Sequence, residues 1–366
     1  MHILQIANDY LGSGLYKLLF AALEDRGHTH TVFVPMKHGT VIPEVKERVH
    51  VVPCFSDLDR LLFYRKQNTM LRWMEKNLDF QEFDLIHAHT VFSGGYAAFQ
   101  LHKRYGIPYI VAVRDTDVNV FFKYMLHLRH VGVEILRNAS KVIFLSPAYQ
   151  EKVLRDCVPL EHLEEIAAKS VILPNGINKM FLENPPAPKE SVHDPLELIY
   201  VGLLNSRKNP ELTVEAVKLL RSRGLDANLT IIGAIQDEKY RALMENTDFV
   251  TYHDRCPQEE VIAHLRKADI FVMPSHRETF GLVYAEAMSQ GLPVIYTAGQ
   301  GFDGHFPEGE VGFSVSDRDP ADVADKILKI TENYAEISKN AISGAKKFDW
   351  DAIAARYDEL YRELCP

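Results

Sequence analysis

Short runs of hydrophobic residues alternate with longer amphipathic stretches along the whole chain. In the first half, seven such runs predict β-strands, at His2–Ala7, Thr31–Pro35, His50–Pro53, Asp84–His89, Tyr109–Val113, Lys141–Leu145 and Val171–Leu173. In the second half, six more are Leu198–Val201, Leu229–Ile232, Phe249–Tyr252, Ile270–Met273, Pro293–Tyr296 and Gly312–Val315. Strands that alternate with helices form parallel sheets covered by helices on both faces. The pattern therefore predicts an α/β protein.

A proline-rich run, Glu183–Asp194, interrupts this alternation and predicts a linker between two doubly wound domains. We expect a first domain over residues 1–182 and a second over residues 195–349. The last segment, residues 350–366, predicts an amphipathic helix from Trp350 to Leu364. Formal charge differs between the halves, with a balance of +2 over residues 1–180 and −11 over residues 181–366. This difference supports two separate bodies.

Composition narrows the class of protein. The 366 residues are 46% hydrophobic and 25% charged, as in a globular protein, and no hydrophobic run approaches the roughly 18 to 20 residues that span a bilayer. The start of the chain predicts a strand and no signal peptide. Four dispersed cysteines are typical of free thiols in the cytoplasm. A net charge of −9 argues against nucleic-acid binding.

The segment Asp269–Ile295 carries the most informative chemistry. A buried strand ends at Pro274-Ser275, a loop follows, and a helix begins near Gly281 and closes at Gly291-Leu292-Pro293. Two carboxylates, Glu278 and Glu286, flank the helix start. Ligands of α/β proteins bind at such strand ends, where carboxylates accept hydrogen bonds from sugar hydroxyls. The alternative is that both glutamates only cap and solvate the helix.

Other strand ends carry glycines and cations. Gly12 and Gly14 follow the first strand, although Lys17 stands where a dinucleotide fingerprint has its third glycine. Gly202 ends a later strand, and Arg207-Lys208 follow it before a helix that starts near Pro210. These cations predict a diphosphate site, with a solvated loop as the alternative. Gly233 ends the next strand, where a small residue leaves room for a nucleoside.

His87 and His89 point to the same side of a strand end because side chains alternate with period two. Together with Arg114 and Asp115 at the end of the following strand, they predict a polar pocket. A metal site is not expected, since no third ligand stands at convincing spacing. The two DxD patterns, at Asp115–Asp117 and Asp317–Asp319, are too short to predict one in a chain with 50 acidic residues.

Two stretches of the first half mix basic, leucine and aromatic residues, Asp57–Asn77 and Phe121–His130. Such helices are typical of a core-facing element with a solvated basic face. They also fit peripheral contact with a membrane or with a lipid-linked substrate. We keep both interpretations.

Taken in order, these pieces resemble the retaining glycosyltransferases of family 4. The family motif of two glutamates separated by seven residues is matched by Glu278 and Glu286. The other matching pieces are Gly12-Ser13-Gly14, His87-Ala88-His89, Pro174-Asn175-Gly176-Ile177, Gly202 with Lys208, Gly233 and the terminal helix. The resemblance spans nearly the whole chain. It implies the GT-B fold, in which two Rossmann-like domains face each other across a cleft and the terminal helix crosses back to the first domain.

The resemblance also implies roles. Lys208, with Arg207, would bind the diphosphate of a nucleotide sugar, Glu286 its ribose, and Glu278 the transferred sugar. The backbone of Phe280, Gly281 and Leu282 would cap sugar and phosphate. Gly12 and Gly14 would close over the diphosphate, while Gly202 and Gly233 would also contact the donor. His89 would take part in catalysis, and His87, Arg114 and Asp115 would line the sugar or acceptor pocket.

This sequence departs from the family at Leu203, where an arginine is usual, and at Arg114, where a histidine is common. The resulting hypothesis is a retaining, metal-independent hexosyltransferase without a cofactor. Its donor would be a UDP-sugar, or a GDP-sugar, and its acceptor a sugar or a lipid-linked sugar in bacterial surface polysaccharide or glycolipid assembly. We expect a cytoplasmic protein, at the inner face of the membrane if it binds one. The alternatives are a nucleotide-sugar epimerase, a phosphorylase, or a non-catalytic nucleotide-sugar-binding subunit.

Overall fold

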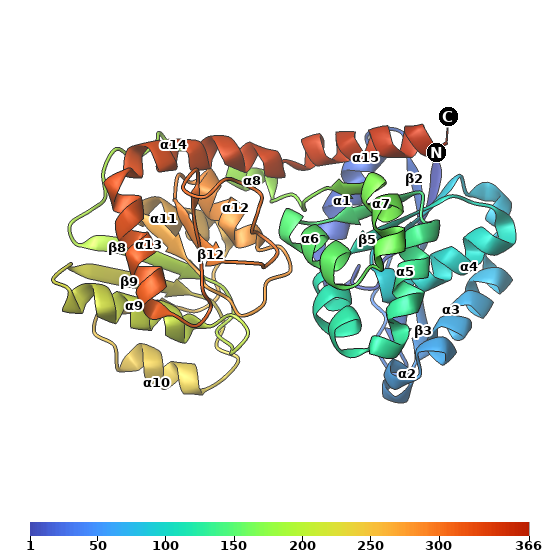
Figure 1. Cartoon of the computed structure of the whole chain (residues 1–366), viewed down its shortest axis with the longest axis horizontal. Coiled ribbons are helices and arrows are strands. Elements are labelled where there is room, and N and C mark those ends of the chain that lie inside the picture. Colours follow the sequence, from blue (N-terminus) through green and yellow to red (C-terminus); the bar gives the residue numbers. More distant parts are fainter. Residues whose placement is uncertain (366) are drawn as a thin grey trace. The chain divides into compact units, whose positions relative to one another are not determined.

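The chain forms two compact units in the computed structural model, which describes residues 1–365 without the side chains of residues 60 and 61 (Figure 1). Unit 1 contains Met1–Asn175 and the C-terminal residues from Trp350 onward, whereas unit 2 contains Gly176–Asp349. Residue 366, at the end of the predicted terminal segment, lies outside the described residues, as do the side chains of residues 60 and 61 in the predicted amphipathic stretch.

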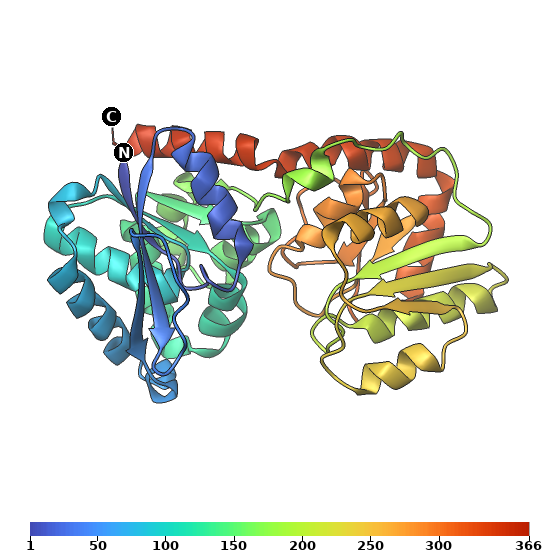
Figure 2. The same cartoon turned by 180° about the vertical axis from the view of Figure 1, so that it is seen from behind.

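Unit 1 is built on a seven-stranded parallel sheet (Figure 2). The strands are β1 (His2–Ile6), β2 (Thr29–Lys37), β3 (Val49–Phe55), β4 (Leu85–Ala88), β5 (Tyr109–Val113), β6 (Lys141–Phe144) and β7 (Ser170–Ile172). Their order across the sheet is β3-β2-β1-β4-β5-β6-β7. All seven predicted strands are present, with ends that differ by at most two residues.

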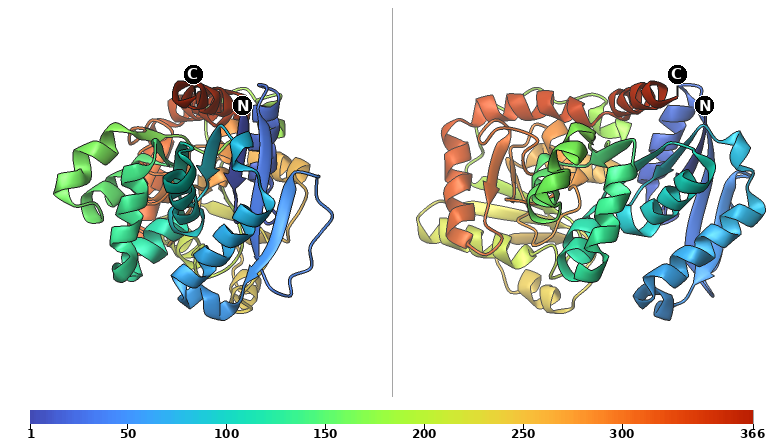
Figure 3. Two further views of the ribbon diagram at one scale, coloured as in Figure 1. Left: turned by 90° about the vertical axis from the view of Figure 1, so that its right-hand side faces the viewer. Right: turned by 45° about the vertical axis from the view of Figure 1, so that its right-hand side comes forward.

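Helices cover both faces of this sheet (Figure 3). They are α1 (Gly14–Glu24), α2 (Asp57–Leu61), α3 (Phe63–Asn77), α4 (Tyr96–Tyr105), α5 (Arg129–Asn138), α6 (Pro147–Asp156), α7 (Leu160–Ala168) and the terminal α15 (Trp350–Leu364). Four single turns, η1 (Phe80–Glu82), η2 (Val91–Gly95), η3 (Asp117–Phe122) and η4 (Leu126–Leu128), complete the connections.

Successive residues of one strand supply two different cores. On β5, Tyr109, Val111 and Val113 belong to one buried cluster, while Ile110 and Ala112 belong to another. The two clusters follow from the alternation of side chains along a strand. Strands buried on both faces read as continuous hydrophobic runs, which explains why the sequence indicates them so clearly.

The terminal helix α15 packs on unit 1 beside α1 (Figures 1 and 2). Its buried residues include Ile353, Tyr357 and Tyr361, which join the core cluster that contains Ile3 and Ile110. Polar contacts also hold the helix, since the His28 ring lies 2.7 Å from the Asp358 carboxylate. The helix is therefore an integral part of the first sheet's cover.

Unit 2 has a six-stranded parallel sheet in the order β10-β9-β8-β11-β12-β13. The strands are β8 (Leu196–Val201), β9 (Ala227–Ile232), β10 (Val250–His253), β11 (Ile270–Val272), β12 (Val294–Thr297) and β13 (Gly312–Val315). The helices are α8 (Lys179–Leu182), α9 (Pro210–Ser222), α10 (Lys239–Glu245), α11 (Gln258–Lys267), α12 (Leu282–Ser289), α13 (Pro320–Glu332), α14 (Tyr334–Ala345) and the turn η5 (Lys346–Phe348). The six predicted strands are all present.

The predicted boundary and linker differ from the structure. Unit 2 begins at Gly176, so residues 176–182 leave the predicted first domain. The Gln290 side chain donates to the carbonyl of Phe181 over 2.8 Å. Within the proline-rich run, the His193 N–H donates to the Asp269 carboxylate over 3.0 Å, and Arg266 donates to the carbonyl of Asn184 over 2.8 Å. The proline-rich run is therefore packed against unit 2 and is not a free linker, because specific side chains bind its backbone.

Candidate functional site

Each sheet has one topological switch point, where the strand order reverses. In unit 2 it lies between the neighbouring strands β8 and β11, and in unit 1 between β1 and β4. Ligands of open α/β sheets bind outside the carboxyl ends of the strands at such points. His87 lies within β4. The other predicted site residues follow these four strands, apart from Gly233 after β9 and Arg114 and Asp115 after β5.

An ion pair occupies the switch point of unit 2. Lys208, in the loop after β8, donates from Nζ to Oε2 of Glu278, in the loop after β11. Their side chains are only 12% and 6% exposed, so the pair is largely shielded from water. Tyr200 supports the lysine loop, because its hydroxyl lies 3.2 Å from the Leu203 carbonyl oxygen and 3.3 Å from that of Lys208. The structure thus brings together the two predicted charged residues.

The backbone around Glu278 is fixed by the loop after β12. Its N–H donates to Oε1 of Gln300 over 3.1 Å, and its carbonyl accepts from the N–H of Gly301 over 3.1 Å. A Cβ on Gly301 would come within 2.1 Å of the Thr279 carbonyl oxygen, so only glycine allows this approach. Gln300 was not predicted as a site residue, because no sequence motif marks it.

Asn209 is a second residue of the site that was not predicted from the sequence. It has a left-handed backbone with φ of 54°, and its side-chain amide donates to the carbonyls of Pro274 and Asp317, each over 3.0 Å. It therefore ties together the loops after β8, β11 and β13. The signal was present as an asparagine directly before Pro210, the first residue of α9, because asparagine tolerates the left-handed region better than most residues.

The start of α12 depends on a glycine. Gly281 caps the helix with φ of 79°, and a Cβ there would come within 2.3 Å of the Tyr284 ring. The preceding side chain, Phe280, is buried and packs edge-on against Phe348, with ring centroids 5.5 Å apart. Leu282 is the first helical residue. The side chain of Phe280 is committed to the core, so any ligand contact at this position would use its backbone.

Glu286 lies within α12 and is half-buried. Across the described residues, its carboxyl group has no hydrogen-bond or ion-pair partner. Burial raises the pKa of Glu286 from its ordinary value of 4.5 to about 7. A carboxyl group that is half protonated near neutrality and has no protein partner is suited to bind ligand hydroxyls.

Two glycines bring the loops after β8 and β9 into contact. A Cβ on Gly233, which has φ of 149°, would come within 1.9 Å of the Gly202 carbonyl oxygen. The Tyr252 hydroxyl donates to the carbonyl of Gly233 over 3.1 Å. Arg207 has an exposed side chain near these loops, and its carbonyl accepts from the N–H of Arg277 over 3.4 Å. The predicted cations thus differ, since Lys208 points at Glu278 and Arg207 faces solvent.

In unit 1, the glycine loop leads from β1 into α1. The Ser13 hydroxyl accepts from the N–H of Leu15 over 3.3 Å and so caps the helix that begins at Gly14. A Cβ on Gly12 would come within 2.5 Å of the Asp9 carboxylate, whereas one on Gly14 would meet nothing within 4 Å. A side chain at position 12 would therefore only require the Asp9 carboxylate to move, and Gly14 is not sterically constrained.

The two histidines face the same side, as predicted, and their rings stack 4.0 Å apart. Both are 0% exposed. His87 Nδ1 lies 2.8 Å from the Tyr361 hydroxyl of α15, and His89 Nε2 lies 2.8 Å from Oε1 of Gln5. Burial lowers the pKa of His87 to about 3 and that of His89 well below its ordinary value, so both are neutral. This burial contradicts the expectation that they line a substrate pocket, and it contradicts a catalytic contact by His89.

Arg114 and the nearby aspartates build local structure. Arg114 donates from Nε to the carbonyl of His89 over 3.2 Å and from its terminal nitrogen to Asn175 over 3.1 Å. Asp115 is buried and accepts from the Asn119 amide over 2.7 Å. Asp117 accepts from three backbone N–H groups, including that of Arg114 over 3.0 Å, and burial raises its pKa to about 6. Arg114 is half-exposed, whereas the two carboxylates are buried among protein donors.

Residues 1–365 contain no group of three or more His, Cys, Asp or Glu side chains arranged to hold a metal ion. They also contain no helix that is both long and hydrophobic enough to cross a bilayer.

Solved structures share this architecture. Sucrose-phosphate synthase from Thermosynechococcus elongatus superposes with a TM-score of 0.76 and 22% identity over 100% of this chain and 99% of that chain. HepE from Anabaena, in complex with UDP and glucose, superposes with a TM-score of 0.69 and 17% identity over 99% of this chain and 100% of that chain. The two parallel-sheet units and these neighbours define the fold as that of the GT-B glycosyltransferases.

Family models identify the group within that class. The model described as glycosyltransferase family 4 matches residues 17–179, and the model described as glycosyl transferases group 1 matches residues 183–348. A D-inositol 3-phosphate glycosyltransferase of Arthrobacter sp. (strain FB24) is 28% identical over 303 residues, which cover 76% of this chain and 70% of that protein. An uncharacterized glycosyltransferase of Methanocaldococcus jannaschii is 26% identical over 292 residues, which cover 77% of this chain and 76% of that protein. The chain belongs to the family 4 and group 1 glycosyltransferases.

Proposed function

We propose that this protein transfers a sugar, with retention of configuration, from a nucleotide diphosphate sugar to an acceptor hydroxyl. The observation that carries this proposal is the shielded Lys208–Glu278 pair at the switch point of unit 2. Lys208 would bind the diphosphate and Glu278 the hydroxyls of the transferred sugar. The diphosphate and the sugar would be bound at one place, because the two strands that precede Lys208 and Glu278 are neighbours in the sheet.

The remaining donor contacts follow from the surrounding elements. Glu286 would bind the ribose through its unpartnered carboxyl group, and the backbone of residues 280–282 would cap sugar and phosphate at the start of α12. Gly202 and Gly233 would leave room for the nucleoside, while Arg207 would add positive charge to the diphosphate. Gly12 and Gly14 would contact the diphosphate from unit 1.

The chemistry we propose is a front-face transfer without a covalent intermediate. Glu278 is paired with Lys208, and the role we propose for it is to position the sugar. Lys208 would stabilise the negative charge that develops on the departing diphosphate, and a phosphate oxygen would accept the proton of the acceptor hydroxyl. No metal and no cofactor enters this scheme. His89 would act through Gln5, as a positioning residue for β1.

For the donor we favour a UDP-sugar over a GDP-sugar, because the structural neighbour HepE binds UDP and glucose. Thermal-shift measurements with UDP and GDP test the base, since a ligand that binds the native state raises its stability. The anomeric configuration of the product, followed by NMR, tests retention. Transfer that persists in excess EDTA supports the metal-free scheme, and its loss would contradict it.

The same assays separate the alternatives. A nucleotide-sugar epimerase would convert its donor without any acceptor, and a phosphorylase would require inorganic phosphate. A non-catalytic binding subunit would bind UDP yet release none from any UDP-sugar. Release of UDP that depends on an acceptor would support the transferase.

For the acceptor we propose a sugar or lipid-linked sugar at the cytoplasmic face of a bacterial membrane, in surface polysaccharide or glycolipid assembly. Support comes from exposed hydrophobic side chains in the two stretches that the sequence marked: Leu58, Leu62, Tyr64, Tyr124 and Leu126. Sedimentation with vesicles of anionic phospholipid tests the peripheral contact. A protein that stays in the supernatant at low salt would contradict it.

A further inference from the structure

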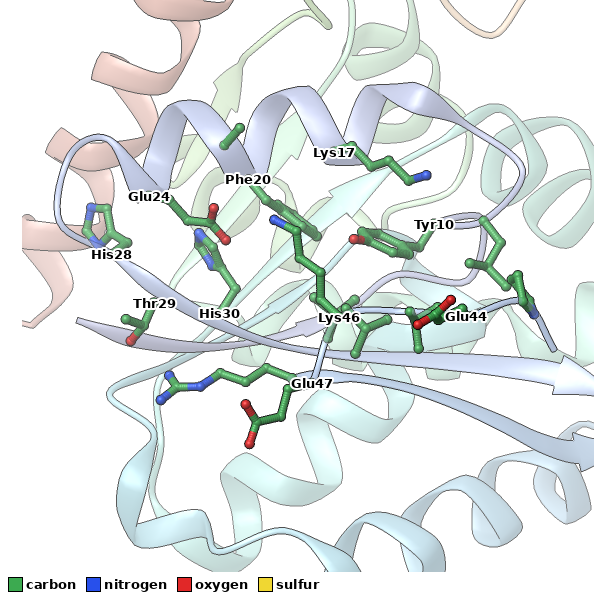
Figure 4. Close-up of a pocket in the computed structure, with 17 residues that line it drawn as sticks. Tyr10, Lys17, Phe20, Glu24, His28, Thr29, His30, Glu44, Lys46 and Glu47 are labelled. Carbon is green, nitrogen blue, oxygen red and sulfur yellow. The ribbon is translucent and has the colours of Figure 1, made fainter.

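Unit 1 contains a cavity of about 840 Å³, and Tyr10 and Leu11 extend its lining into the loop that follows β1 (Figure 4). Its walls are α1, the first half of β2, the start of β3 and the segment Pro43–Arg48 that leads into β3. The volume lies within the range of roughly 300 to 1,000 Å³ that is typical of small-molecule sites. The lining contains none of the residues that we propose for donor binding or predicted for the acceptor pocket.

The inner surface of the cavity is mainly hydrophobic and aromatic. Its buried lining residues are Tyr10, Phe20, His28, His30, Val32 and Val49. Three of these rings form a series, since the Phe20 ring stacks on Tyr10 at 5.9 Å and on His30 at 5.1 Å. Burial lowers the pKa of His30 to about 3, so this imidazole is neutral at physiological pH. The interior therefore offers hydrophobic contact and no charge.

The rim of the cavity carries balanced charge. Three cationic and three anionic side chains surround it, all of them exposed: Lys17, Lys46, Arg48, Glu24, Glu44 and Glu47. The described residues form no ion pair that involves any of these six. A nucleotide or a phosphorylated sugar would need an excess of positive charge, which this rim lacks. The rim instead suits a neutral polar group that donates hydrogen bonds to the carboxylates and accepts them from the lysine and arginine side chains.

Two exposed hydrophobic side chains directly precede the lining segment in the sequence. Val41 is 87% exposed and Ile42 is 46% exposed, directly before the lining segment that starts at Pro43. Aliphatic side chains this exposed are costly to leave in water. The hydrophobic interior and these exposed neighbours in the sequence thus favour a ligand with a hydrophobic part.

We propose that this cavity binds the hydrophobic part of an amphiphile, an alkyl chain or aromatic ring attached to a neutral polar head, and that this amphiphile is the acceptor. The interior would hold the hydrophobic part and the charged rim would hydrogen-bond the head. The second half of the proposal rests on the proposed transferase function, whereas the first half does not.

The test uses the full-length protein and the neutral fluorescent probe N-phenyl-1-naphthylamine. Ala21 lines the cavity from an exposed position on α1, so Ala21→Trp fills the space without disturbing the core. Leu18 is an exposed neighbour on the same helix that does not line the cavity, and Leu18→Trp is the matched control. We expect Ala21→Trp to weaken probe binding at least about tenfold, the order expected when a site is blocked, and Leu18→Trp to leave it unchanged.

A second variant guards against an indirect effect of the tryptophan. Val45 is half-buried in the lining segment, and Val45→Asp would place a charge against the ligand. It should also weaken probe binding, with unchanged circular dichroism. Octyl β-glucoside below its micellar concentration should displace the probe, whereas glucose should not. Equal probe binding by Ala21→Trp and wild type would overturn the proposal, as would displacement by glucose alone or by UDP.

The two proposals fail separately. If UDP stabilises the wild-type protein and Ala21→Trp alike while only Ala21→Trp loses the probe, the cavity is independent of the donor site, as proposed. If UDP-sugars are never consumed but probe binding behaves as expected, the transferase assignment fails and the cavity remains a site for amphiphiles.

Discussion

At the scale of single residues, Lys208 and Glu278 show how the sheet creates chemistry. They are 70 positions apart in the chain, and only the adjacency of β8 and β11 brings them into contact. A lysine and a carboxylate shielded from water cost free energy unless they stay paired. The pair therefore holds both side chains in place before a donor arrives, and donor binding must share or replace it.

Lys208→Ala should lower kcat/KM by roughly 10² or more, because it removes electrostatic stabilisation of the leaving diphosphate. Steady-state kinetics with a UDP-sugar measure the effect. The matched control is Lys239→Ala, which breaks the exposed pair of Lys239 with Glu211 in the same unit and should change the rate by less than about twofold. A Lys208→Ala enzyme as fast as this control would show that Lys208 does not contact the diphosphate.

Glu286 gives a prediction on pH. With a pKa near 7 in the folded protein and 4.5 as its ordinary value, it keeps a proton between pH 4.5 and 7 that the unfolded chain has lost. Its contribution to stability is therefore complete below pH 4.5 and is lost as the pH rises to 7. Glu286→Gln removes this loss, so the variant should gain stability relative to wild type between pH 5 and pH 8.

Urea unfolding at both pH values measures this difference, and Glu215→Gln, at an exposed position of α9, reports the effect of the same substitution elsewhere. If Glu286→Gln and wild type differ in free energy of unfolding by the same amount at pH 5 and pH 8, the carboxyl group is not protonated near neutrality.

At the scale of elements, the sequence predicted the regular parts and missed the contacts between them. All thirteen strands were found, most of them because strands buried on both faces are continuous hydrophobic runs. The run Glu183–Asp194 appeared to be a free linker because its proline content resembles one, yet Asp269 holds its backbone from a distance of 76 residues. Likewise, period two predicted the shared side of His87 and His89 correctly, but not the helix α15 that covers them.

Gly233→Ala tests the close approach of the loops after β8 and β9. The new Cβ would collide with the Gly202 carbonyl, so the two loops must separate and UDP affinity should fall by at least about tenfold. Gly224→Ala is the matched control, because Gly224 also has a positive φ, of 89°, but nothing lies within 4 Å of its Cβ position. Calorimetric titration with UDP compares the variants, and equal affinities would remove Gly233 from the donor site.

At the scale of the whole molecule, most of the proposed donor residues belong to unit 2. The alternation of strands and helices was enough to predict two doubly wound domains, and an ordered set of weak motifs was enough to propose the donor residues. Burial could not be predicted in the same way. His89 and Glu278 both follow a strand at a switch point. The packing of the surrounding elements leaves the His89 ring with no exposed surface, whereas it places the Glu278 side chain beside Lys208.

This concentration of contacts predicts where a donor stabilises the protein. A ligand at 100 times its Kd stabilises the native state by about 2.7 kcal/mol, and local opening is suppressed most strongly where the contacts lie. Hydrogen exchange followed by mass spectrometry should therefore show that UDP protects residues 202–209 and 276–290 more than any segment of the sheet of unit 1. In Lys208→Ala the protection should be reduced in both segments together, because the lysine joins their loops. Protection confined to unit 1 would place the nucleotide at the other switch point and would reverse the assignment of the two units.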